Sequence, residues 1–239
     1  MFDMYAYFAN VPRKDVYKDL CWKMGRNLDK NGEPRKAIPI TPPFPEEVES
    51  PLMDVESRHA TYTALLSRLS LAQDHRENLR NRGLTDAEID RLGYKTTPVA
   101  GMSMMAKQLR SEGYYLAGVP GFFRKESGEW TFVHEARGIL IPVRDQKGLI
   151  QGLQIRRDNT EKRKFRWVSS TDRKDGCKAE GWAHLAGSVS AQMILTEGPM
   201  KADVIHELTG ISVIAVPGVN SLTQLKVMLE ALRDEGVVR

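Results

Sequence analysis

The chain has 239 residues, of which 41% are hydrophobic and 28% are charged, and its formal net charge is +4. This length and composition predict a globular protein with one large domain or two small ones. We expect a cytoplasmic protein without a membrane partner, because no apolar run approaches the roughly 20 residues of a membrane span and residues 1–10 lack the basic-then-apolar order of a secretory signal.

The first 50 residues are expected to form a separate N-terminal part. They predict a helix around Val16 to Met24, followed by a proline-rich connector over residues 37–51. Proline lacks the backbone N–H that a helix interior needs, so the connector indicates a boundary.

Residues 51–187 open with predicted helices. One starts at about Thr61, and a second is predicted over residues 86–92 because Thr85 and Glu88 have the spacing of a capping box. A third is expected over residues 103–111. The apolar stripe of the first helix consists of Leu65, Leu66, Leu69 and Leu79.

β-Hairpins follow these helices. The first joins residues 122–123 to residues 130–132 through a short turn that contains Gly128. The second joins residues 138–143 to residues 149–156, and a further strand is expected from Phe165 to Val168. We therefore expect an α+β module that combines helices with β-hairpins.

The return strand of the second hairpin has two different faces. Leu149, Leu153 and Ile155 share one face, because side chains alternate along a strand. Gln154 and Arg156 share the other. One face is expected to pack against the core, which leaves the other face for a ligand.

The basic residues gather in one stretch of the chain. Between Ile155 and Lys178 nine basic residues stand against four acidic ones. Such a cluster is compatible with a partner that carries phosphates. Cysteine and histidine, in contrast, show no metal-ligand spacing. These residues are Cys21, Cys177, His59, His75, His134, His184 and His206.

Residues 188–239 alternate between strand and helix. Buried strands are predicted over residues 193–196 and 211–216, and Val237 begins a third. Such a βαβαβ unit implies a parallel sheet whose ligand site lies beyond the carboxyl ends of its strands. The side chains of the first helix that we expect to face the sheet are Met200, Val204, Ile205 and Leu208.

Glu197 is the candidate for chemistry at this sheet. It directly follows a predicted strand, while Gly198 allows a ligand to approach the backbone and Pro199 suits the first turn of a helix. A carboxylate placed there can hold Mg²⁺ or act as a general base in phosphoryl transfer. The alternative is that Glu197 only stabilises its own helix through the helix dipole.

Four segments in a fixed order resemble one known family. Residues 82–89 read R-G-L-T-D-A-E-I, and residues 137–145 read R-G-I-L-I-P-V-R-D, followed by a glycine turn and Arg156. Lys164-Phe165 precedes two serines, and residues 196–200 read T-E-G-P-M. Together they resemble the catalytic core of bacterial DnaG-type primases and the first Toprim motif, E-G-x-x-D. The residues of these motifs are most similar to those of a divergent branch of the family found on phages and other mobile elements.

The resemblance implies an α+β fold with three parts. Residues 1–50 would hold the N-terminal helix and the connector, residues 51–187 a basic primase-like module, and residues 188–239 a Toprim-like α/β subdomain with a parallel sheet. It implies Mg²⁺ or Mn²⁺ as cofactor, with Glu197 as metal ligand or general base. The residues implied in binding phosphates are Arg137, Arg144, Arg156, Lys164 and Arg166. Their alternative is a solvated basic loop.

The sequence also departs from the family pattern. Lys201 stands where the Toprim motif has an aspartate, and the second motif, Asp-x-Asp, would lie beyond Val238. The chain as given would therefore supply only part of a metal site. Lys201 can bind a phosphate or replace a metal's charge, or simply be exposed. Gly218 and Asn220 are candidates to line the same crevice, or else form a plain turn and helix cap.

Three functions follow from these features. The first is metal-dependent synthesis of RNA primers on single-stranded DNA, with nucleotides as substrates and a replicative helicase as a possible partner. The second is a nucleic-acid-binding or replisome-interaction module without catalysis. The third is a Toprim nuclease. The aspartate pair separates catalysis from binding, because a metal site for phosphoryl transfer needs several carboxylates.

Overall fold

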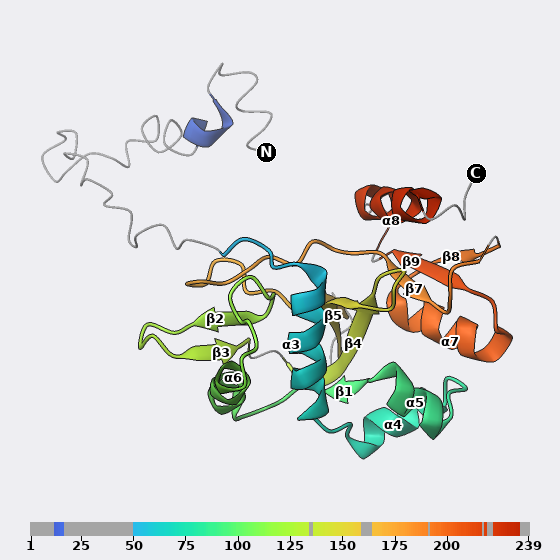
Figure 1. Ribbon diagram of the computed structural model, residues 1–239, viewed down its shortest axis with the longest axis horizontal. Coiled ribbons are helices and arrows are strands. Elements are labelled where there is room, and N and C mark those ends of the chain that lie inside the picture. The colour runs from blue at the N-terminus through green and yellow to red at the C-terminus, as the bar shows by residue number, and fades with distance from the viewer. Residues whose placement is uncertain are drawn as a thin grey trace, which may run out of the picture. The chain divides into compact units, whose positions relative to one another are not determined.

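The computed structural model describes residues 12–16, 50–133, 136–158, 164–190, 192–216, 218 and 222–234 (Figure 1). The chain divides into two compact units, Met1–Pro45 and Glu46–Arg239. In the first unit only a short 3₁₀ turn, Arg13–Asp15, and its neighbours are described. The helix predicted up to Met24 and nearly all of the proline-rich connector lie outside the described residues. None of the described helices is long and apolar enough to cross a membrane.

Two helices of the second unit, α3 and α5, begin at side-chain caps. Helix α3, Val55–Ser67, starts earlier than predicted because the carboxylate of Asp54 accepts a hydrogen bond from the backbone N–H of Ser57 at 2.7 Å. The chain then turns, so that Leu79 belongs to a separate helix, α4. The prediction of a single leucine stripe on one helix was therefore wrong. The remaining helices of this part are α4 (Gln73–Arg80), α5 (Asp86–Leu92) and α6 (Met102–Ser111). The capping box that predicted α5 is confirmed.

The two predicted hairpins form parts of two antiparallel sheets. Strands β2 (Phe122–Arg124) and β3 (Trp130–Phe132) pair as the first hairpin, and β4 (Gly138–Arg144) pairs with β5 (Ile150–Arg157) as the second. Both hairpins are confirmed. The larger sheet has the order β1-β4-β5-β6, in which β6 is Phe165–Trp167 and the unforeseen β1 is Lys95–Thr96.

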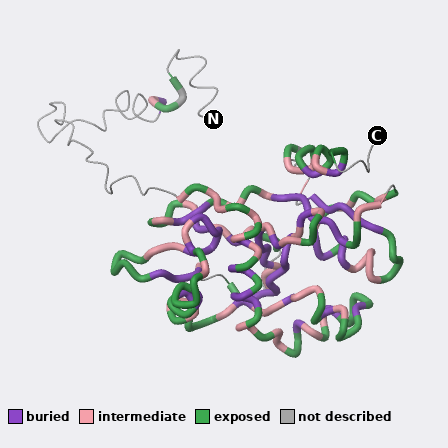
Figure 2. The backbone as a smooth tube through the Cα atoms, in the orientation of Figure 1, coloured by how far each residue is buried: buried purple, intermediate pink, exposed green. Residues whose placement is uncertain are grey.

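Strand β5 separates the core from a polar face. Leu153 and Ile155 are buried with residues of α3, α6 and the β2–β3 hairpin in one hydrophobic cluster, and Figure 2 shows much of β4 and β5 as buried. Gln154 and Arg156 point the other way, as alternation along the strand predicts. The core side of this strand therefore fixes where its polar side chains lie.

The C-terminal sheet is mixed, which corrects the expectation of a purely parallel one. Strand β8 (Ile194–Glu197) runs parallel to β9 (Val213–Val216), but β7 (His184–Ala186) pairs with β9 in antiparallel fashion. The order is β7-β9-β8. The third strand predicted from Val237 lies outside the described residues.

Two helices cover opposite faces of this sheet. Helix α7 (Pro199–Thr209) packs through Ala202 on one face, and α8 (Leu222–Asp234) packs through Met228 on the other. Three details differ from the sequence prediction. Met200 and Val204 of α7 pack in the cluster of Tyr94, Ile139 and Ile141 instead of with the strands of this sheet. Strand β8 is exposed rather than buried, with Leu195 58% exposed, and Leu208 of α7 is 61% exposed instead of facing the sheet.

Candidate functional site

Glu197 lies at the carboxyl end of β8, level with the end of the parallel strand β9. Gly198 follows with φ near +85°, a conformation that favours glycine, and α7 begins at Pro199. No side chain caps the start of α7, and among the described residues the Glu197 carboxylate has no hydrogen-bond or ion-pair partner. Glu197 therefore has the predicted position at the rim of the sheet, and its side chain does not cap helix α7.

A pocket of about 260 Å³ opens beside Glu197. Its walls come from the α4–α5 link, β5, β6 and the start of α7. The residues that line it are Arg82, Gln154, Arg156, Lys164, Phe165, Arg166, Trp167, Glu197, Gly198, Met200 and Lys201. The structure thus brings six of the predicted site residues together in one hollow.

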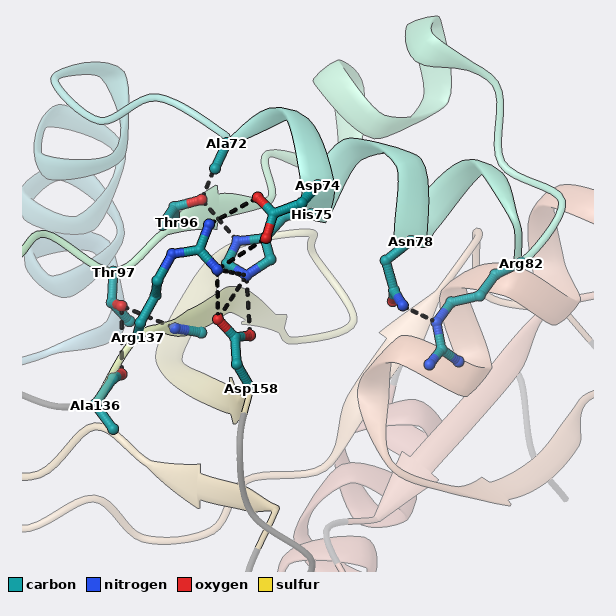
Figure 3. Close-up of polar contacts among 11 residues, drawn as sticks. Ala72, Asp74, His75, Asn78, Arg82, Thr96, Thr97, Ala136, Arg137 and Asp158 are labelled. Atoms are coloured by element: carbon teal, nitrogen blue, oxygen red, sulfur yellow. Dashed lines mark hydrogen bonds and ion pairs between the residues drawn. The ribbon is translucent and has the colours of Figure 1, made fainter.

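Arg82 is the pocket residue that sequence reasoning missed. It lies just past α4 and its Nε donates to the side chain of Asn78 at 3.2 Å (Figure 3). It belongs to the segment 82–89 that resembles the primase family, but that segment predicted only the helix after it. Nothing in the local pattern indicates that this arginine reaches β5, more than 70 residues later in the chain.

Positive charge dominates the pocket. Five cationic side chains line it together with a single carboxylate. Burial lowers the pKa of the Arg156 guanidinium, and the nearby charge of Arg82 lowers it further. The Nε of Arg156 is buried without a hydrogen-bond partner among the described residues. Like charges held this close favour an anionic ligand between them.

Arg137 does not reach this pocket. Its guanidinium donates to Asp74 at 2.7 Å and to Asp158 at 2.6 Å, next to the buried ring of His75 (Figure 3). These bonds raise the pKa of Arg137 and hold the pKa of Asp74 at about 2. The predicted phosphate contact at Arg137 is therefore replaced by an ion-pair cluster that joins the start of α4 to the end of β5.

Arg144 is also placed away from the pocket. Its guanidinium donates to the carbonyl oxygens of Gly148 and Leu92, both at 3.2 Å, and burial lowers its pKa. It links the hairpin turn to the end of α5. A structural role explains this arginine better than the phosphate contact that the sequence predicted.

A buried polar network holds α7 in place. The carboxylate of Asp203 accepts hydrogen bonds from the hydroxyl of Tyr94 at 2.5 Å and from Nε2 of His184 at 3.0 Å. The backbone N–H of Arg144 donates to Nδ1 of His184 at 2.9 Å, so this nitrogen acts as an acceptor and Nε2 is the nitrogen that faces Asp203. Sequence spacing gave no sign of this network, because its members come from three distant segments.

The remaining predicted residues do not line the pocket. Gly218 follows β9 at the same end of the sheet as Glu197 but is not a lining residue, and Asn220 lies outside the described residues. A larger cavity of about 560 Å³ runs along α6 and the β2–β3 hairpin. Arg166 lines both hollows.

The described residues do not fit a divalent metal at Glu197. Within the described part of the chain no group of three or more His, Cys, Asp or Glu side chains could hold a metal ion. Mg²⁺ and Mn²⁺ prefer oxygen ligands, whereas Glu197 shares its pocket with cations. The donor set beside Glu197 suits an anion.

Comparisons with known proteins give the fold. No protein-family model and no curated protein matches the sequence. The RNA polymerase domain of Mycobacterium tuberculosis primase DnaG in complex with double-stranded DNA is 17% identical, with a TM-score of 0.55, over 75% of this chain and 61% of that one. The zinc-binding and RNA polymerase domains of Aquifex aeolicus primase are 15% identical, with a TM-score of 0.51, over 95% and 54%. The chain thus spans little more than half the length of these structures, and its fold is that of the DnaG primase core.

Proposed function

We propose that this chain is a primase-like nucleic-acid-processing protein that binds single-stranded DNA and nucleotides at the Glu197 pocket. One observation carries the proposal: β5, β6 and the start of α7 bring basic side chains into one hollow with a carboxylate that has no partner among the described residues. Basic residues beside aromatic ones are typical of grooves that hold single strands.

Each part of the pocket has a role in this proposal. Arg156, Lys164 and Arg166 bind phosphates, and Phe165, which is 47% exposed, offers its ring to a base. Gly198 leaves the backbone open, since no atom lies within 4 Å of where a side chain would start. Glu197 then accepts the proton of a ribose 3′-hydroxyl whose oxygen attacks the α-phosphorus of a nucleoside triphosphate. The new P–O bond replaces the bond to the β-phosphate, and pyrophosphate leaves.

A second function has an observation of its own. Lys201 lines the pocket where the family motif has an aspartate, which removes a carboxylate from the site. That difference favours a module that binds nucleic acid without joining nucleotides.

Other parts of the proposal rest on the sequence resemblance. They are the placement in the phage and mobile-element branch, the contact with a replicative helicase and the cytoplasmic location. The M. tuberculosis structure was solved with DNA, and we extend nucleic-acid binding from that protein to this chain as part of the same proposal.

The test measures binding and synthesis separately. Fluorescence anisotropy with single-stranded DNA between about 50 and 200 mM salt should give a log affinity that falls linearly with log salt. Primer synthesis from labelled ribonucleotides should be lost in Glu197→Gln, while binding stays or strengthens because a negative charge has left a basic pocket. Failure to bind single-stranded DNA at low salt overturns the proposal. Binding without synthesis selects the second function.

A further inference from the structure

The start of α7 places Lys201 and Glu197 in the same pocket wall. Among the described residues neither side chain has an ion-pair partner, although Glu197 ends β8 and Lys201 lies in the first turn of α7. Helix α7 also directs the positive end of its dipole toward this pocket. The lysine therefore adds charge to the site instead of neutralising the carboxylate.

Arg82 and Arg156 extend this charge across the pocket. They lie close enough that the charge of Arg82 lowers the pKa of the Arg156 guanidinium. Placing two guanidinium groups together costs free energy in the empty protein. That cost is relieved when an anion lies between them, and the partnerless buried Nε of Arg156 offers a further donor.

Charge balance indicates which anion fits. Among the described residues that line the pocket of about 260 Å³, cationic side chains outnumber the single carboxylate, and Lys201, Arg82 and Arg156 are three of them. A phosphodiester carries one negative charge, whereas a terminal phosphate adds about 1.5 to 2, so three linked phosphates carry about 3.5 to 4. Linked phosphates therefore match several cationic donors better than a single phosphodiester does.

We infer that the Glu197 pocket binds an oligophosphate, such as the triphosphate of a nucleotide, directly through Lys201, Arg82 and Arg156, without a divalent cation. The inference deepens the proposed function, since it names the ligand of the same pocket and rests on that proposal for the nucleotide. Lys201 takes the place of the metal's charge. The ligand is recognised by its phosphates, and its base is not specified.

The test uses the full chain and inorganic tripolyphosphate, followed by isothermal titration calorimetry in EDTA and in excess Mg²⁺. We expect binding in EDTA, and equal or weaker binding in Mg²⁺, because the metal masks phosphate charge. Orthophosphate should bind at least about tenfold more weakly, since it can meet only part of the donor set. Binding that requires Mg²⁺, or equal affinity for both anions, overturns the inference.

The matched variants are Lys201→Asp and Lys147→Asp. The first restores the family's aspartate and should weaken binding in EDTA by about tenfold or more, because it removes a charged donor and adds a repulsive carboxylate. The second makes the same charge change on an exposed turn away from the pocket, and should stay within about twofold. Wild-type affinity in Lys201→Asp overturns the inference.

Two further measurements separate the possible failures. Thermal unfolding checks the fold of Lys201→Asp, in which an acid in the first turn of α7 is favoured by the helix dipole, and Lys201→Gln repeats the test without charge reversal. Anisotropy with single-stranded DNA on the same proteins tests the proposed function by itself. Metal-free oligophosphate binding without DNA binding would refute only the proposed function, and the reverse result would refute only this inference.

Discussion

The charged side chains around the start of helix α7 fall into two groups, one that lines an open pocket and one that is buried. At its start Glu197 and Lys201 line an open pocket, and within the described chain neither has a partner. Two residues after Lys201, Asp203 is 3% exposed and bonded to both Tyr94 and His184. A buried polar group is tolerated only when it is hydrogen-bonded, so the network around Asp203 serves stability. Charges that remain open can serve a ligand.

The arginines on the hairpin β4–β5 repeat this contrast. Arg137 and Arg144 have protein partners and stay away from the pocket, whereas Arg156 is in the pocket with a partnerless Nε. All three belong to segments that resemble primases. The resemblance to primases therefore indicates the right segments of the chain. The partners of each side chain decide which arginine is available to bind a ligand.

The largest effect should come from removing the buried carboxylate. Asp203→Ala leaves the Tyr94 hydroxyl and Nε2–H of His184 without an acceptor, and each unsatisfied buried donor costs about 1–3 kcal/mol. We expect a loss of about 2–4 kcal/mol in the free energy of unfolding, measured by urea denaturation. Tyr94→Phe should cost less by itself, and almost nothing in the Asp203→Ala background. Additive effects would contradict a shared network.

Gly152 should come next, because it lies beneath two packed rings. A Cβ at this position would lie 2.5 Å from the ring of Trp182, which packs edge-on against Trp167 at 5.5 Å between centroids. Gly152→Ala should destabilise the protein by about 1–3 kcal/mol through overpacking. In a Trp182→Phe background the cost should shrink, since the contacting ring atoms are gone. An equal cost in both backgrounds would reject this contact as the cause.

The two hairpin arginines offer a matched pair for binding. Arg156→Ala should weaken binding of single-stranded DNA by about tenfold and lower the salt slope by about one, as for the loss of one phosphate contact. Arg137→Ala removes the same charge from the ion-pair cluster and should change affinity by less than about twofold. Anisotropy titrations at several salt concentrations measure both. A larger loss in Arg137→Ala would reverse our assignment of the two arginines.

The smallest effect should be a pH dependence at Asp74. Its bond to Arg137 holds its pKa at about 2, below the usual 3.8, so the folded state binds this proton less readily than the unfolded state does. The stabilisation is complete above about pH 5 and disappears as the pH falls through 2. The difference in unfolding free energy between wild type and Asp74→Asn should therefore shrink as the pH is lowered from about 5 through 2. High salt should reduce this difference at every pH. A difference that is as large at pH 2 as at pH 5 would contradict the assigned cause.

Local elements were predictable because their signals are local. The capping box of Thr85 and Glu88 satisfies backbone groups within one helical turn, and alternation along β5 follows from strand geometry alone. Glu197 could be placed at the rim of a sheet for the same reason. The exposure of β8 and the antiparallel β7 could not, because they depend on which strands become neighbours.

The sequence by itself determined the hairpins, the position of Glu197 after a strand, and the charge of the segment that contains Arg156 and Lys164. The tertiary structure decided that Arg82 would join them, that Arg137 and Arg144 would be bound elsewhere, and that Asp203 would be buried. The physical reason is the distance along the chain over which each kind of interaction acts. Periodicity and capping act over a few residues, whereas the partner of a charge is set by packing between segments that lie far apart in the chain.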